Sequence, residues 1–198
     1  MKLSDETLYN QYLRKHKRKQ NRGYNSQDSE RQKTYEAEFA MLRKVGNVEY
    51  NSIEQVQKVA KSIYKSKTWG KLWSESINDD VTAIFRSMPP VESKLRSTGR
   101  GTSGWTNGRS VTLDTKVGLN KYTLLHELTH CLGHMHHGRS FRQTLLKMVG
   151  TFLGAEHKKV LKQEFKKRKL AYGDAKKPMS FEQWKATKVK LEKMREKV

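Results

Sequence analysis

Residues 124–141 read LLHELTHCLGHMHHGRSF, and this stretch carries the most informative pattern in the chain. Leucines recur among its polar residues at helical spacing, which predicts a buried helix over 119–132. Glycine at both ends of 133–138 predicts a turn. A second helix over 139–153 is predicted by an apolar stripe, formed by Phe141, Leu145, Met148 and Phe152. The stretch therefore predicts two helices joined by a histidine-rich turn.

His126, Glu127 and His130 form the pattern HExxH within the first of these helices. Residues four apart lie on one helix face, so both imidazoles are able to reach one Zn2+ ion. Glu127 is displaced around the helix, and we expect it to act as a general base toward water rather than as a ligand. HExxH also arises by chance, but five of the seven histidines lie between residues 126 and 137. This clustering favours a metal site with a third histidine ligand.

Two neighbouring histidines compete to be that third ligand. His136 completes the metzincin spacing HExxHxxGxxH, which also requires a methionine turn, and Met179 is the only well-separated candidate for that turn. His137 lies four residues before Phe141 and continues its inward face, so the sequence favours His137. We expect His134, and whichever neighbour is not a ligand, to face solvent, to contact a ligand from behind, or to belong to the turn.

The flanking segments predict further helices and two short strands. Helices are expected from about Ser29 to Gly46, from Asn51 or Ser52 through the tryptophans near 69–73, over 155–172, and from Phe181 onward. Alternating patterns predict strands at 81–85 and 111–113, separated by Pro89-Pro90 and by a loop or hairpin over 97–108. The predicted fold class is α+β, a mostly helical zincin-like domain with a small β-sheet next to the HExxH helix.

The charge pattern predicts three segments and an anionic partner. We expect a basic N-terminal arm over 1–27, too polar to order itself alone, a core domain over 28–172, and a charged helical tail over 173–198. The formal net charge is +21, from 41 Lys and Arg against 20 Asp and Glu. Such a surface attracts polyanions, and nucleic acid is the expected partner. Scattered lysines that merely solvate helix faces would give the same count.

Cys131 is the only cysteine in the sequence. A disulfide within the chain and a cysteine-based zinc cluster are therefore both excluded, which favours a reducing, cytoplasmic setting. We interpret Cys131 as a small buried apolar residue. The sequence shows neither an apolar signal-peptide core nor a run long enough to cross a bilayer, so we expect no membrane partner.

The HExxH motif is followed by HGxxF at residues 137–141, and together they resemble a family. It comprises small zinc metallohydrolases of actinobacteria and their phages, distantly similar to SprT-like metallopeptidases. The resemblance covers about residues 28–172 and includes Asp28-Ser29-Glu30-Arg31 with Tyr35 and Glu38, the segment 52–56, and Trp69. It implies a zincin-like fold, with zinc held by His126, His130 and His137 and with Glu127 as base.

The expected function is that of a zinc-dependent hydrolase, with a metallopeptidase acting on protein or peptide as the favoured form. The strand at 111–113 is expected at a sheet edge beside the metal, where it can align an extended peptide. Candidates to stabilise the oxyanion are Tyr122, Arg139 and Tyr172. The alternatives are a catalytically idle, zinc-stabilised protein that binds nucleic acid or serves in a phage particle, and a peptidase that acts on DNA-bound proteins.

Overall fold

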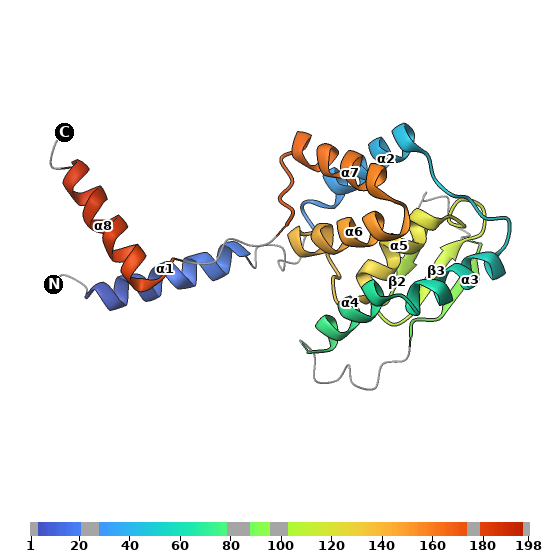
Figure 1. The fold of residues 1–198 in the computed structure, drawn as a ribbon, viewed down its shortest axis with the longest axis horizontal. Helices are drawn as coiled ribbons and strands as arrows, with labels where there is room; N and C mark the ends of the chain where they lie inside the picture. Colours follow the sequence, from blue (N-terminus) through green and yellow to red (C-terminus); the bar gives the residue numbers. More distant parts are fainter. Residues whose placement is uncertain (1–3, 21–27, 79–87, 96–102, 174–178, 196–198) are drawn as a thin grey trace. The chain divides into compact units, whose positions relative to one another are not determined.

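The computed structural model describes residues 4–20, 28–78, 88–95, 103–173 and 179–195 (Figure 1). Within them the chain forms α1 (Asp5–Gln20), α2 (Arg31–Val45), α3 (Ile53–Tyr64), α4 (Lys67–Asn78), β1 (Val91–Lys94), β2 (Gly104–Thr106), β3 (Val111–Asp114), α5 (Lys121–Cys131), α6 (Arg139–Phe152), α7 (Ala155–Lys167) and α8 (Phe181–Arg195). The mostly helical α+β class is thus confirmed. The strand predicted at 81–85 lies outside the described residues, and none of the described helices is long and apolar enough to cross a membrane.

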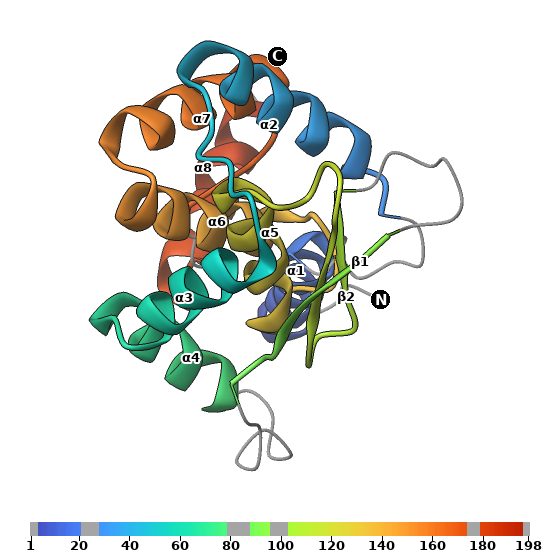
Figure 2. The same cartoon turned by 90° about the vertical axis from the view of Figure 1, so that its right-hand side faces the viewer.

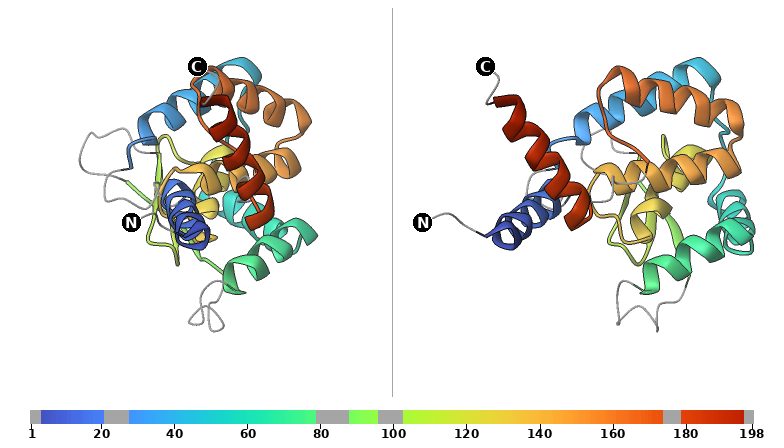
Figure 3. Two further views of the ribbon diagram at one scale, coloured as in Figure 1. Left: turned by 90° about the vertical axis from the view of Figure 1, so that its left-hand side faces the viewer. Right: turned by 60° about the vertical axis from the view of Figure 1, so that its left-hand side comes forward.

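Two compact units make up the chain. One comprises residues 28–173 and holds α2–α7 and the sheet, and the other comprises residues 1–27 with 174–198 and holds α1 and α8. The first is called the core unit below, and the second the terminal unit. Within the core unit α2 lies alongside α7, as both views in Figure 3 show.

The three-stranded sheet has the order β1-β3-β2. β1 is parallel to β3, with Val91 opposite Val111, and β2 is antiparallel to β3, with Trp105 opposite Thr112. Helix α5 packs against β2 and β3, while α3 packs against β1 (Figure 2). The prediction that 111–113 is an edge strand is therefore wrong, because this segment is the central strand. The edge beside α5 is β2, within the segment expected to be a loop or hairpin.

Helix α5 is enclosed by the core on all sides. Every residue from Tyr122 to Cys131 is buried. Leu124, Leu125 and Leu128 belong to one apolar cluster, shared with α3, α4 and the sheet. Tyr122 belongs to a second cluster, shared with α2, α6 and α7. A helix surrounded in this way can hold polar side chains in fixed positions, because packed neighbours leave them few alternative rotamers.

Local signals set both ends of α5. The Asn120 side chain accepts a hydrogen bond from the Thr123 backbone N–H at 2.8 Å, which caps the first turn. Gly133, with φ of 90°, follows the last turn in the left-handed region that favours glycine. The chain can then reverse through 134–138 and begin α6, which brings His137 back toward α5.

The terminal unit contains two packed helices, α1 and α8. The rings of Tyr9 on α1 and Phe181 on α8 meet edge to face, with their centres 5.2 Å apart. The Tyr9 hydroxyl donates to the Met179 carbonyl at 2.8 Å, and the Met179 N–H donates to the Tyr12 hydroxyl at 3.0 Å. Aromatic residues from the other end of the chain thus supply the apolar contact that α1 lacks alone, a long-range effect that its own composition does not predict.

Candidate metal centre

Three buried histidines converge in the core unit. His126 and His130 lie one turn apart on α5, and His137 lies at the end of the turn that leads into α6. The Nε2 atom of His126 is 3.2 Å from Nε2 of His130 and 3.1 Å from Nε2 of His137. One nitrogen from each ring lies within 4.8 Å of the others, so the three residues are close enough to bind one metal ion.

The spacing of these nitrogens fits a tetrahedral ion. Zinc–nitrogen bonds of about 2.0–2.1 Å place two ligand nitrogens of a tetrahedral site about 3.3 Å apart. The two measured separations from His126, 3.1 and 3.2 Å, are close to this value. Three histidines also leave a fourth position for water or substrate, as in hydrolytic zinc sites.

The opposite nitrogen of each ring faces a hydrogen-bond acceptor. A backbone carbonyl accepts only, so Nδ1 of His130 must carry the proton and its Nε2 presents a lone pair. The same tautomer in the other two rings directs three lone pairs at one point, an arrangement that a cation stabilises. The acceptors are Glu38 Oε2 for His126 at 3.1 Å, the His134 carbonyl for His130 at 2.5 Å, and Asp28 Oδ2 for His137 at 2.5 Å.

Burial keeps these imidazoles neutral. Desolvation lowers the pKa of His126 to about 3 and, together with the neighbouring histidines, lowers the pKa of His130 to about 2. Desolvation, and the repulsion that a second proton would meet beside His126, also lower the pKa of His137, against the hydrogen bond to Asp28. Only the neutral ring offers a nitrogen lone pair to a metal, so the three residues are in the form that binds one.

Glu38 is the buried carboxylate beside this cluster. Its side chain lies on α2, is 3% exposed, and has a pKa raised to about 8 by burial. Tyr122 lowers that pKa, but its hydroxyl falls short of hydrogen-bond geometry, and Oε1 of Glu38 has no hydrogen-bond partner among the described residues. A buried carboxylate with an unpaired oxygen is costly, and a nearby dication offsets that cost.

Arg142 fixes the main chain of His137. Its guanidinium, on α6, is fully buried and donates to the carbonyl oxygens of His137 at 2.5 Å and Ala171 at 2.8 Å. It also pairs with Glu30 at 2.8 Å. Asp28 accepts from the His137 N–H at 3.2 Å as well as from its ring, so His137 is held at three points.

Glu127 is buried between α5 and strand β2. A methyl group at Gly104 would lie 2.9 Å from Cγ of Glu127 and 3.0 Å from its Oε1, so only glycine allows this close approach. Desolvation and the charge of Glu38 raise the pKa of Glu127 to about 8, while Arg31 lowers it. The proposed general base is thus held against the edge strand, with a proton affinity suited to transfer near neutral pH.

The remaining residues that the sequence singled out near the motif are not among the three clustered histidines. His136 is half-buried and outside the group that can hold a metal, and Met179 belongs to the terminal unit. His134 contributes its carbonyl to His130 and its ring to Thr144 at 3.0 Å. Cys131 is buried, as predicted, and contacts the Thr106 hydroxyl at 3.3 Å.

Of the proposed oxyanion groups, Tyr122 lies beside the histidines, with its ring centre 6.5 Å from that of His126, whereas Arg139 and Tyr172 contact other groups. Arg139 donates to the Gly173 carbonyl, and Tyr172 packs on Phe165. Tyr122 is buried with its hydroxyl toward Glu38. Two further aromatic rings pack on the cluster. Phe141 of α6 is stacked on His130 with ring centres 4.5 Å apart, and the half-buried Tyr35 of α2 has its centre 4.8 Å from that of His137.

Asp28, Glu38, Arg142 and Tyr35 were given no role from the sequence. The family resemblance singled out the segment that begins at Asp28, but a motif match assigns no contact. No family model, curated protein or solved structure matches this chain. What can be said of its function therefore depends on the geometry of the histidine cluster.

Proposed function

We propose that this protein is a zinc-dependent hydrolase and that its favoured reaction is cleavage of peptide bonds. The observation that carries the proposal is the convergence of three neutral, buried histidine nitrogens, each ring held from behind by an acceptor. Zinc in such a site acts as a Lewis acid and lowers the pKa of water to near neutrality.

Glu127 supplies the proton transfer in this proposal. It is adjacent to the ligand His126 in sequence and lies a fraction of a turn away on α5, so its carboxylate is displaced from the ligand face. It accepts a proton from the attacking water and later delivers that proton to the leaving amine. A purely structural zinc site requires no buried carboxylate here, which favours the catalytic proposal over an idle one.

Strand β2 supports a peptide as the substrate. β2 is at the edge of the sheet and packs on α5, and its Gly104 lies so near Glu127 that an added methyl group would clash with it. An extended peptide can pair with the outer side of such a strand through main-chain hydrogen bonds. That pairing brings a carbonyl group alongside Glu127 and the histidines.

The net charge supports a second proposal, that the substrate or partner is associated with nucleic acid. A charge of +21 attracts phosphate backbones whether or not the zinc site is active. If the protein is a catalytically idle, zinc-stabilised DNA-binding protein, its DNA affinity would fall steeply with salt, and Glu127→Gln would change no measured property. A peptidase acting on DNA-bound proteins would show both the salt dependence and the loss on Glu127→Gln.

The direct test of the hydrolase is Glu127→Gln in the full chain. We expect the rate of cleavage of a fluorogenic peptide library to fall by about 10²–10⁴-fold, because the general base is removed. The zinc content and melting temperature should be retained, since Glu127 is not a ligand. Cleavage at the natural rate by the variant would contradict the proposed role.

A further inference from the structure

Arg31 lies next to the Tyr35 ring at the edge of the histidine cluster. It is the first residue of α2 and is exposed. Its guanidinium carbon lies 5.3 Å from the centre of the Tyr35 ring. That ring in turn lies 4.8 Å from the ring of His137 and 5.6 Å from that of His126. Two contacts thus connect an exposed cation to the candidate metal ligands.

The Tyr35 ring places Arg31 at the edge of the histidine cluster, because the same ring packs on Arg31, His137 and His126. The guanidinium is therefore close to the place where a substrate would reach the candidate metal ligands.

Arg31 also differs from two arginines of the core unit that have carboxylate partners. Arg142 pairs with Glu30 at 2.8 Å and Arg168 with Glu164 at 2.5 Å. Within the described part of the chain, no carboxylate forms an ion pair with Arg31. A guanidinium offers a rigid fork of donors that fits a carboxylate, and the ring beneath it limits its motion. The N-terminus of α2 adds a partial positive charge at the same place.

We propose that Arg31 binds a carboxylate of the substrate, either an acidic side chain or a free C-terminus. The hydrolase would then select anionic peptides over neutral ones. This inference rests on the proposed function, which it deepens by naming the substrate class.

Peptide binding to the full-length, zinc-loaded Glu127→Gln variant tests the inference without turnover. Four peptides share one sequence, with Glu or Gln at one central position and with a free or amidated C-terminus. Calorimetry should show that one of the two carboxylates improves Kd by about tenfold, the effect of one charge-assisted interaction of ~1.4 kcal/mol. The position that matters identifies which source of carboxylate Arg31 binds.

Two further substitutions separate Arg31 from general electrostatics. Adding Arg31→Ala should abolish the preference for the carboxylate. Adding Arg43→Ala should leave it intact, because Arg43 is an exposed arginine at the opposite end of the same helix. Equal affinity for all four peptides, or equal losses in the two variants, would overturn the inference. Unchanged melting temperatures and zinc contents establish that both variants are folded.

Cleavage by the natural chain, measured in parallel, keeps the two proposals apart. Equal cleavage of acidic and neutral peptides would overturn the role of Arg31 and leave the hydrolase standing. An Arg31-dependent preference in binding, with no peptide cleaved under any condition, would overturn the hydrolase and support the anion site.

Discussion

Two carboxylates of the core unit are equally hidden from solvent and yet have opposite proton affinities. Glu38 on α2 and Glu164 on α7 are each 3% exposed. Hydrogen bonds from Lys44, Arg168 and Lys167 lower the pKa of Glu164 to about 2, whereas burial raises the pKa of Glu38 to about 8. The difference lies in what covers each group.

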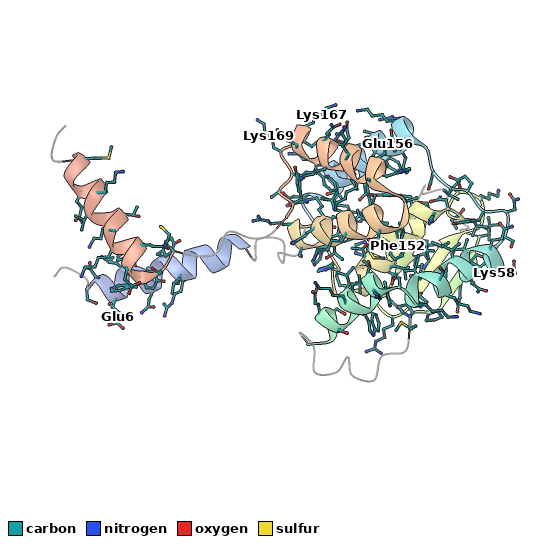
Figure 4. All side chains as sticks on the ribbon, viewed as in Figure 1. Glu6, Lys58, Phe152, Glu156, Lys167 and Lys169 are labelled. Carbon is teal, nitrogen blue, oxygen red and sulfur yellow. The ribbon has the colours of Figure 1, made fainter. Side chains whose placement is uncertain are left out.

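Glu164 is covered by its own cations. Lys44 and Lys167 remain 48% and 63% exposed while they contact it, and Figure 4 shows Lys167 at the outer side of α7. Its charge is thus fully compensated by the chain itself. Glu38 contacts a neutral histidine, and its Oε1 has no hydrogen-bond partner within the described part of the chain. The comparison teaches that cations of the chain contact Glu164 directly, whereas a histidine is the only described cationic group within ion-pair distance of Glu38. We infer that a metal ion supplies the missing positive charge.

The largest effect on stability should come from replacing one arginine in each region, Arg142 beside the histidine cluster and Arg168 beside Glu164. Arg142→Met removes a buried donor from two carbonyl groups, and we expect it to lower the free energy of unfolding by about 3 kcal/mol. Arg168→Met removes a partly exposed ion pair near Glu164 and should cost about 1 kcal/mol or less. Urea unfolding of both variants measures the difference. Equal losses of unfolding free energy in the two variants would show that the buried contacts of Arg142 stabilise the fold no more than the partly exposed ion pair of Arg168.

Zinc affinity should change when Glu38 is replaced and should stay the same when Glu164 is replaced. Glu38→Gln weakens the acceptor behind His126, so we expect zinc affinity to fall by about 10–100-fold, the usual effect of losing the carboxylate that orients a histidine ligand. Glu164→Gln should leave zinc affinity unchanged. Competition with a chromophoric chelator gives both constants. A similar loss in both variants would remove the distinction drawn between the two carboxylates.

The pH dependence of stability should have opposite signs for the two groups. The lowered pKa of Glu164 means that its contribution is present above pH 4.5 and lost as pH falls toward 2. The raised pKa of Glu38 means that it lowers the stability of the metal-free chain as pH rises from 4.5 toward 8. The differences in unfolding free energy between the natural chain and Glu164→Gln or Glu38→Gln, measured against pH, isolate each slope. Slopes of the same sign would refute the comparison.

The sequence predicted what depends on short separations along the chain. His126 and His130 are one helical turn apart, and the apolar stripe through Phe141 favoured His137, the third histidine of the cluster. The turn that begins at Gly133 is equally local. These features follow from backbone geometry, so a single sequence is enough to anticipate them.

The missed features depend on distant segments. Asp28 accepts from Nδ1 of His137 and Glu38 from Nδ1 of His126. Each carboxylate lies about a hundred residues before its histidine, so no spacing rule links the two. The same holds for the strand order, which puts β3 in the centre, and for α1, whose aromatic partners come from the C-terminal end. Tertiary contacts decide each of these outcomes, and local periodicity contains no information about them.

The central claim is that His126, His130 and His137 hold one metal ion. Elemental analysis of the natural chain and of His126→Ala, His137→Ala and His136→Ala, purified identically, tests it most directly. We predict about one zinc per chain in the natural protein and in His136→Ala, and almost none in the other two. A natural chain that takes up no metal after zinc is resupplied, or a metal that is lost with His136 but kept without His137, would contradict the account.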